Sequence, residues 1–256
     1  MQAFSAQWRI LKALMIRDMI VRFGRDNIGF VWVILEPMIL CLGVMTIWSV
    51  IKPPYEHGVQ VLTFVITGYM PLTLFRHLTN GGLHIVSRSA GLLYHRGITH
   101  LDLFLARMLL EFTATTVALC AIYSALAIAG YAEPIHDIRL VAGGWLLLGW
   151  FSIAVAACLA AATEASESAE RFVQPAQYLS VPLSPIFYMV DWLPAEAQTF
   201  MRYNPMSHPY EMIRGGVFGP NVQATYDPGY TFMAGLVLLA VGLWGLDAAK
   251  ERIHDR

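Results

Sequence analysis

The sequence is poor in charged residues. Only 14% of its 256 residues are Asp, Glu, Lys or Arg, whereas 57% are hydrophobic. A soluble domain averages about 25% charged residues, so we expect much of this chain to face something other than water. The formal net charge of −1 and the absence of a long basic tract give no indication of a nucleic-acid partner.

Cysteine is scarce as well. Cys41, Cys120 and Cys158 lie far apart inside apolar runs, and there is no Cys-x-x-Cys pair. This pattern predicts buried small hydrophobic side chains rather than a disulfide framework. The eight histidines are scattered over loops and the ends of apolar runs without ligand spacing, so we expect no metal site.

Motifs for nucleotide binding and hydrolysis are missing. The sequence contains no Gly-x4-Gly-Lys-Ser/Thr, no His-Glu-x-x-His and no Gly-x-Ser-x-Gly, so we expect no nucleotide site in this chain. Glu164, Glu167 and Glu170 share one helical face, which we interpret as a solvated or partner-facing acidic edge. Catalysis by these carboxylates is the alternative.

Six long apolar runs dominate the chain. Each is long enough to cross the hydrocarbon core as a helix, and helices satisfy their backbone polar groups within the segment. We therefore predict an all-α integral membrane protein with six transmembrane helices in a single domain, 28–256. The runs are 28–51, 59–75, 108–132, 140–163, 172–190 and 228–247.

The Lys and Arg residues predict the orientation. Most of the 17 flank the run ends that share a side with both termini, so the positive-inside rule places both termini in the cytoplasm. Residues 1–27 are basic and half apolar, which predicts a helix at the cytoplasmic interface. Partial burial of this helix against the bundle or a partner is the open alternative. Residues 76–107 form the long cytoplasmic loop.

The segment 191–227 is the longest outside loop. It contains two candidate helices, Pro194–Tyr203 and Pro209–Arg214, the second ending at Gly215-Gly216. Each is too short to span a membrane and too apolar for an ordinary soluble loop. These features predict a re-entrant hairpin between spans five and six.

Glu36 and Pro37 stand inside the first apolar run. An ionisable group within a span is costly and usually functional, and the proline leaves a backbone carbonyl without its helical donor. We expect Glu36 to face the bundle interior and to pair with a basic or hydroxyl group. The alternative is a span that begins later, with Glu36 at the interface.

Three segments, taken in order, resemble the membrane subunits of polysaccharide-exporting ABC transporters. They are RFGRDNIGFVWVILEP (22–37), LFRHLTNGGLHIVSRSAGLLYHRGITHLDLFLARMLLE (74–111) and SPIFYMVDWLPAEAQTFMRYNPMSHPYEMIRGGVFG (184–219). The likeness is strongest to the KpsM-type capsular polysaccharide export permeases, whose plan the O-antigen and teichoic-acid permeases share. After the fourth span, the family pattern has a more basic Arg-Asp step. This sequence departs from that pattern there, with TEASESAERF (163–172).

This resemblance implies a bacterial inner-membrane homodimer bound to two copies of a separate ATP-binding subunit. ATP and Mg belong to that partner, and this chain is not an enzyme. The cargo implied is a lipid-linked, acidic capsular polysaccharide, passed to a periplasmic co-polymerase or adaptor and an outer-membrane export protein. A membrane enzyme acting on lipid-linked sugars and a stand-alone ion-coupled carrier are the alternatives.

Three groups of residues are expected to carry the function. A coupling helix within 88–96 would contact the ATPase, and basic residues before the first span would meet a substrate headgroup beside Glu36-Pro37. Aromatic side chains would line a sugar path, with an interfacial aromatic belt as the competing reading. Arg107 and Glu111 are expected to pair as a structural feature. The three groups are Arg88, Leu92, Leu93, Tyr94 and Arg96 for coupling; Arg22, Arg25, Glu36 and Pro37 for the entrance; and Trp32, Tyr69, Phe187, Tyr188, Trp192 and Tyr203 for the path.

Overall fold

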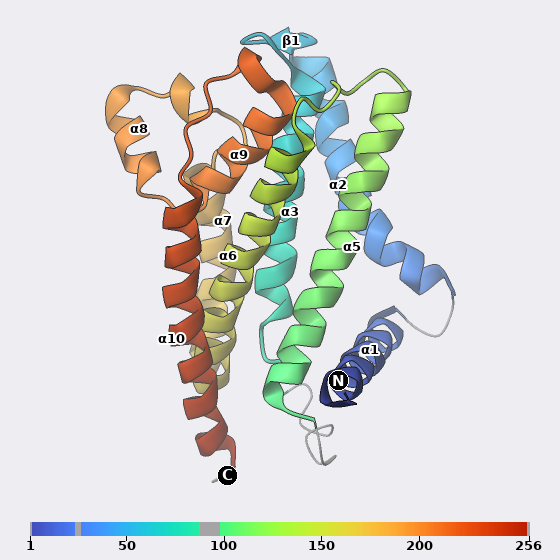
Figure 1. The fold of residues 1–256 in the computed structure, drawn as a ribbon, viewed down its shortest axis with the longest axis vertical. Coiled ribbons are helices and arrows are strands. Elements are labelled where there is room, and N and C mark those ends of the chain that lie inside the picture. Colours follow the sequence, from blue (N-terminus) through green and yellow to red (C-terminus); the bar gives the residue numbers. More distant parts are fainter. Residues whose placement is uncertain (1, 24–26, 86, 88–97, 255–256) are drawn as a thin grey trace.

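The computed structural model describes residues 2–23, 27–85, 87 and 98–254 as a bundle of helices with one small β-hairpin (Figure 1). The elements are α1 (Gln2–Phe23), α2 (Asn27–Ile51), β1 (Tyr55–Glu56), β2 (Val59–Gln60), α3 (Val61–Gly81), α5 (His100–Ile128), α6 (Ile138–Ala165), α7 (Glu167–Leu183), η2 (Val190–Trp192), α8 (Ala195–Arg202), α9 (Ser207–Phe218), η3 (Gly219–Asn221) and α10 (Pro228–His254).

Four of the described helices, α3, α5, α6 and α10, are long and apolar enough to cross a membrane. In α2 the stretch Leu35–Ile51 is apolar but shorter. The helical prediction therefore holds, apart from the unpredicted β1–β2 hairpin. That hairpin turns through His57 and Gly58, whose φ angles are 53° and 79°.

Two helix boundaries differ from the predicted spans. Helix α3 continues to Gly81, beyond the predicted end at 75, so Arg76 lies on a helix and not in the cytoplasmic loop. Helix α7 ends at Leu183 rather than 190. Ser184 is extended there, with φ −104° and ψ 145°, because a residue before proline disfavours the helical conformation and Pro185 follows.

The predicted stop at Gly215-Gly216 is wrong. Helix α9 continues through both glycines to Phe218 and ends at Gly219, where φ is 55°. A Cβ on Gly216 would lie 2.8 Å from the backbone oxygen of Asp137, at the start of α6. The glycine therefore permits close packing of α9 on α6 rather than ending the helix.

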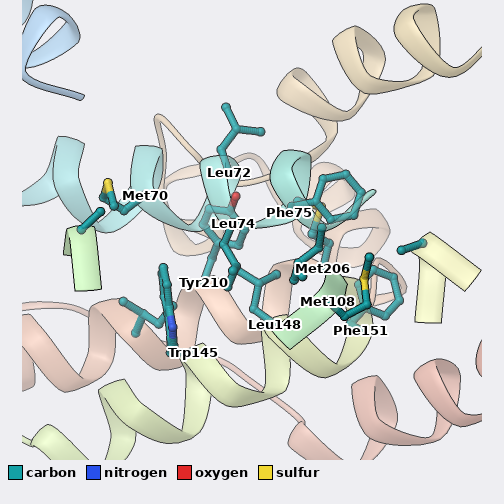
Figure 2. Packing of buried hydrophobic residues seen from close by; sticks show 14 of the residues in the cluster. Met70, Leu72, Leu74, Phe75, Met108, Trp145, Leu148, Phe151, Met206 and Tyr210 are labelled. Carbon is teal, nitrogen blue, oxygen red and sulfur yellow. The ribbon is translucent and has the colours of Figure 1, made fainter. Parts of the chain in front are cut away.

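The core forms where α3, α6 and α9 meet. Helix α6 packs along α10, α9 and α3. Helix α3 is the most enclosed of the four long helices, because 78% of the residues in its 18-residue apolar stretch are buried. Figure 2 shows this packing close up. The labelled side chains are Met70, Leu72, Leu74, Phe75, Met108, Trp145, Leu148, Phe151, Met206 and Tyr210.

Helix α1 packs on α5 and α2 rather than lying free of the bundle. Its Leu11 and Leu14 are buried in the core. The structure therefore agrees with the alternative that was left open, in which this helix is partly buried against the bundle. We call this end of the molecule, toward which both termini lie, the α1 end, and the opposite end the hairpin end (Figure 1).

The three cysteines are free, but their burial differs from the prediction. Cys41 is buried and Cys158 is partly buried, whereas Cys120 is exposed on α5. Helix α5 is one of the four apolar helices long enough to cross a membrane, so an exposed thiol there sits on a surface suited to lipid.

Candidate functional site

Helix α3 exposes one mostly polar face, which we call the α3 stripe: Leu62, Tyr69, Arg76 and Asn80. These residues are half-buried or exposed, whereas nearly all others in α3 are buried. Their spacing of seven and four residues places them on one side of the helix. The most enclosed long helix therefore presents a phenol, a guanidinium and an amide along its open side.

Helix α7 borders the α3 stripe through polar contacts. The buried Gln177 amide donates to the Thr79 hydroxyl at 3.1 Å and to the Asn80 side-chain oxygen at 2.8 Å. The Arg76 guanidinium carbon lies 5.5 Å from the centre of the Tyr178 ring. Gln177 is buried, whereas Tyr178, the next residue of α7, is 66% exposed, and Phe172 on the same helix is exposed as well.

Aromatic rings gather at the hairpin end in what we call the aromatic cluster: Trp48, His57, Phe64, Phe187 and Trp192. The Trp48 and Phe187 rings stack with centroids 5.3 Å apart. Trp192 stacks on His57 at 4.3 Å and on Phe64 at 5.1 Å. A cavity of about 100 Å³ lies among these side chains.

The predicted path residues are brought together only in part. Phe187 and Trp192 belong to the aromatic cluster, and Tyr69 lies on the α3 stripe. The Tyr188 hydroxyl donates to the carbonyl of Pro182 at 3.0 Å. Trp32 and Tyr203 are exposed, and neither stacks on the aromatic cluster in the described part of the chain.

A fully buried arginine stabilises the turn after α7. The Arg214 guanidinium donates to the carbonyls of Pro185, Ile186 and Tyr188, three oxygens of a segment without helical bonding. Its carbon lies 3.8 Å from the centre of the Phe64 ring. Arg214 therefore fixes the segment that carries Phe187 against α3.

Glu211, one helical turn earlier, binds the next part of the same segment and also the segment that follows η3. Its carboxylate accepts the backbone N–H of Val190 at 3.0 Å and of Thr225 at 3.4 Å. Burial raises the pKa of the Glu211 carboxyl, while these hydrogen bonds and the Arg214 charge lower it. Burial lowers the pKa of Arg214 to about 10, so the guanidinium remains charged at neutral pH.

Gly68 makes room for this arrangement. A Cβ at this position would lie 2.2 Å from the Ile186 oxygen and 2.9 Å from Nη2 of Arg214. Sequence reasoning missed the role of Arg214, although an arginine within an apolar stretch is a usable signal.

A larger cavity of about 460 Å³ lies at the α1 end and is lined largely by charged side chains. Glu36 lines it and is half-buried, and Pro37 is buried within α2. The described residues include no hydrogen-bonding partner for Glu36. The lining residues are Arg17, Asp18, Val21, Glu36, His77, Asn80, Gly81, Leu83, Ile85, Arg107 and Glu111.

Ion pairs beside this cavity join three helices. Arg107 Nη2 lies 3.0 Å from Glu111 Oε1, which confirms the expected pair, and Arg107 Nη1 lies 3.2 Å from Asp18 Oδ2 on α1. His77 Nδ1 on α3 lies 3.2 Å from the second Glu111 oxygen. Glu111 is only 1% exposed, so both its oxygens are bound inside the bundle.

The three glutamates do not share one helical face as predicted, because α6 ends at Ala165 and Ser166 is extended, with φ −155° and ψ 123°. Glu164 lies in α6, whereas Glu167 and Glu170 lie in α7. Two of them contact the segment that follows α3. Glu164 accepts the backbone N–H of Ser87 at 3.1 Å, and Glu170 Oε2 lies 3.1 Å from His84 Nε2. These contacts give two of the three glutamates a structural role. Other expected site residues lie outside the described residues, either entirely or by their side chains: Arg22, Arg25, Arg88, Leu92, Leu93, Tyr94 and Arg96.

Comparison with known proteins identifies the family. Residues 9–218 match the model of the ABC-2 type transporter membrane family. The chain is 32% identical to the capsule polysaccharide export inner-membrane protein CtrC of Neisseria meningitidis, over 95% of this chain and 92% of that protein. It is 29% identical to the capsule polysaccharide export inner-membrane protein BexB of Haemophilus influenzae, over 94% and 91% of the two chains.

A third relative is the polysialic acid transport protein KpsM of Escherichia coli, which is 25% identical over 94% of this chain and 93% of its own length. All three relatives are matched over nearly their full length. The resemblance seen in the three sequence segments is therefore confirmed. The chain belongs to the ABC-2 type transporter family of membrane proteins.

Proposed function

We propose that this chain is the membrane-spanning permease subunit of an ATP-driven exporter that moves lipid-linked polysaccharide across the bacterial inner membrane. The names of the relatives CtrC, BexB and KpsM support this assignment. The structural observation that carries it is the α3 stripe together with the aromatic cluster. A path for a sugar chain needs aromatic side chains on which sugar rings can stack and polar groups that form hydrogen bonds with sugar hydroxyls.

The proposed topology has six spans: α2, α3, α5, α6, α7 and α10. Both termini are cytoplasmic, α1 lies at the cytoplasmic interface against the bundle, and α8–α9 form a re-entrant hairpin in the outer leaflet. The α1 end is then cytoplasmic and the hairpin end periplasmic. The length and apolar character of four of these helices support this arrangement, and the distribution of Lys and Arg supports its direction.

The described part of the chain offers no cluster of metal ligands, and the sequence has no Walker-type loop. We therefore assign ATP and Mg to a separate subunit, two copies of which bind a dimer of this chain through segment 88–96. Sugar released at the hairpin end would pass to a periplasmic adaptor and an outer-membrane export protein.

In the exporter, the aromatic cluster closes the hairpin end of the path. A stacked aromatic pair contributes about 0.5–1.5 kcal/mol beyond the area it buries. Such a pair holds Trp48 against Phe187 at rest, yet a passing sugar ring can replace one of the two partners at little cost. The cavity beside this pair, about 100 Å³, already leaves space there.

Deletion of the gene in the native bacterium tests the function. We expect surface polysaccharide to disappear and lipid-linked polymer to accumulate in the cytoplasm, both reversed by the wild-type gene. Leu93→Asp should abolish export and binding of the ATPase, whereas Gln223→Asp, at an exposed position in the loop after η3, should preserve both. Unchanged surface polysaccharide after deletion would refute the proposal.

A further inference from the structure

Arg76 has an unusual position for an arginine. It lies five residues before the end of α3, a helix long and apolar enough to cross a membrane. At about 1.5 Å per residue, this places its Cα about 8 Å inside the helix. A charged side chain inside a membrane helix is costly and normally pairs with an opposite charge or lines a pathway.

The other buried cations of the bundle have such partners. Arg107 contacts the carboxylates of Asp18 and Glu111, and Arg214 donates to three backbone carbonyls. Arg76 differs from both, because its guanidinium makes no hydrogen bond or ion pair with any residue that the structure describes. Its Nε is buried without a partner, as are the Nε atoms of Arg107 and Arg214, so the difference lies in the two terminal nitrogens of Arg76, which have no partner among the described residues.

The group that holds Arg76 is aromatic. Its guanidinium carbon lies 5.5 Å from the centre of the Tyr178 ring. An aromatic face can hold a guanidinium by its flat side. Its N–H donors then remain available, and their fork matches a carboxylate or a phosphate.

We propose that Arg76, oriented by Tyr178, binds an anionic group, a carboxylate or a phosphate, carried by the sugar chain that passes along the α3 stripe. This inference rests on the proposed function and adds the residue that binds the anionic groups of the cargo. Tyr69 and Asn80 lie on the same stripe and provide a phenol and an amide for neighbouring sugar hydroxyls. Arg76 would thus select acidic polymers over neutral ones.

Binding to the full-length chain with its ATP-binding partner in phosphatidylcholine nanodiscs tests the site. The probes are trigalacturonate, which carries carboxylates, and maltotriose, which is neutral. We expect the wild type to prefer trigalacturonate, and Arg76→Gln to lower that affinity about tenfold or more, with little effect on maltotriose. Arg76→Lys should retain part of the preference, because lysine keeps the charge without the planar fork.

Arg139→Gln is the matched control, because Arg139 is an exposed cation at the start of α6; it should bind both probes as the wild type does. The inference is overturned if the wild type shows no preference for trigalacturonate, or if a folded Arg76→Gln variant retains that preference. It is also overturned if Arg76→Gln changes only the amount of native phosphatidylglycerol that co-purifies with the chain, since the anion bound at Arg76 would then be a lipid headgroup.

Export in cells separates this inference from the function on which it rests. If Arg76→Gln exports polymer at the wild-type level, the anion site is wrong and the exporter stands. If the wild-type gene itself does not restore surface polysaccharide to the deletion strain, the proposed function fails.

Discussion

The guanidinium carbon of Arg214 lies 3.8 Å from the centre of the Phe64 ring, which joins α9 to α3 across the segment that follows α7. The same guanidinium donates to three carbonyls of that segment. One side chain therefore holds both Phe64 and the segment that carries Phe187, two members of the aromatic cluster. Stability and the shape of the hairpin end depend on the same residue.

Replacing Arg214 with methionine should be strongly destabilising. The change keeps a long side chain but leaves buried carbonyls without donors, each at a cost of about 1–3 kcal/mol. We expect a loss of about 3 kcal/mol or more in the free energy of unfolding, measured by denaturant titration in detergent. Arg202→Met, at an exposed position on α8, should change it little. Equal stability of the two variants would contradict the role of Arg214.

Two glycine substitutions should have opposite effects. Gly68→Ala places a Cβ 2.2 Å from the Ile186 oxygen, so it should destabilise the protein by about 1–3 kcal/mol. Gly43→Ala in α2 meets nothing within 4 Å and should be neutral or stabilise by up to about 1 kcal/mol. Thermal unfolding of both variants provides the comparison. Stabilisation by Gly68→Ala would disprove the close approach.

Asp18→Asn should loosen α1. The substitution removes the charge that Arg107 contacts at 3.2 Å. Because both side chains are partly exposed, we expect a loss of only about 1 kcal/mol. Amide hydrogen exchange in 2–23 should become about fivefold faster, while α6 remains protected. Asp191→Asn, an exposed aspartate at the hairpin end, is the control. Unchanged exchange in α1 would show that the ion pair does not anchor this helix.

His208 should make stability depend on pH. Its Nδ1 accepts the backbone N–H of Asp227 at 3.1 Å, so Nε2 carries the proton and lies 3.1 Å from the Arg202 oxygen. Burial lowers the pKa of His208, although the Arg202 carbonyl and the Asp227 charge oppose this. The unfolded chain therefore takes up the proton first as pH falls. The stabilisation is complete above about pH 6.5 and decreases as pH falls below it.

The measurement is the melting temperature of the purified chain between about pH 7.5 and about pH 5.5. The wild type should lose more than His208→Gln, which has no titrating group at this position. An identical decrease in the two proteins would assign the pH dependence elsewhere.

The sequence predicted the helices better than their ends. Apolar runs identified α3 and α7. Because a run was taken to stop at the first charged residue, the predicted end of α3 lies before Arg76, whereas the helix continues to Gly81. In α7 the useful signal was Ser184-Pro185, which disfavours helix. The stop predicted at Gly215-Gly216 was wrong. A glycine pair can end a helix or allow another helix to pack closely against it, and the sequence alone does not distinguish the two cases.

The site was less predictable than the fold. The Arg107–Glu111 pair follows from helical spacing, and the structure has it. The contacts of Arg214 with the segment after α7 join residues 26 to 29 positions apart, and no local pattern encodes them. Aromatic residues could be named as candidates, but only the fold brings Phe187 onto Trp48.

The central claim is that this chain is the permease of an ATP-driven polysaccharide exporter. Its most direct test is to purify the chain gently from its native membrane and to identify the co-purifying proteins and their ratio. The account predicts an equimolar ATP-binding subunit whose ATP hydrolysis responds to the cell's own lipid-linked polysaccharide. A stable chain that purifies without any ATPase would contradict it.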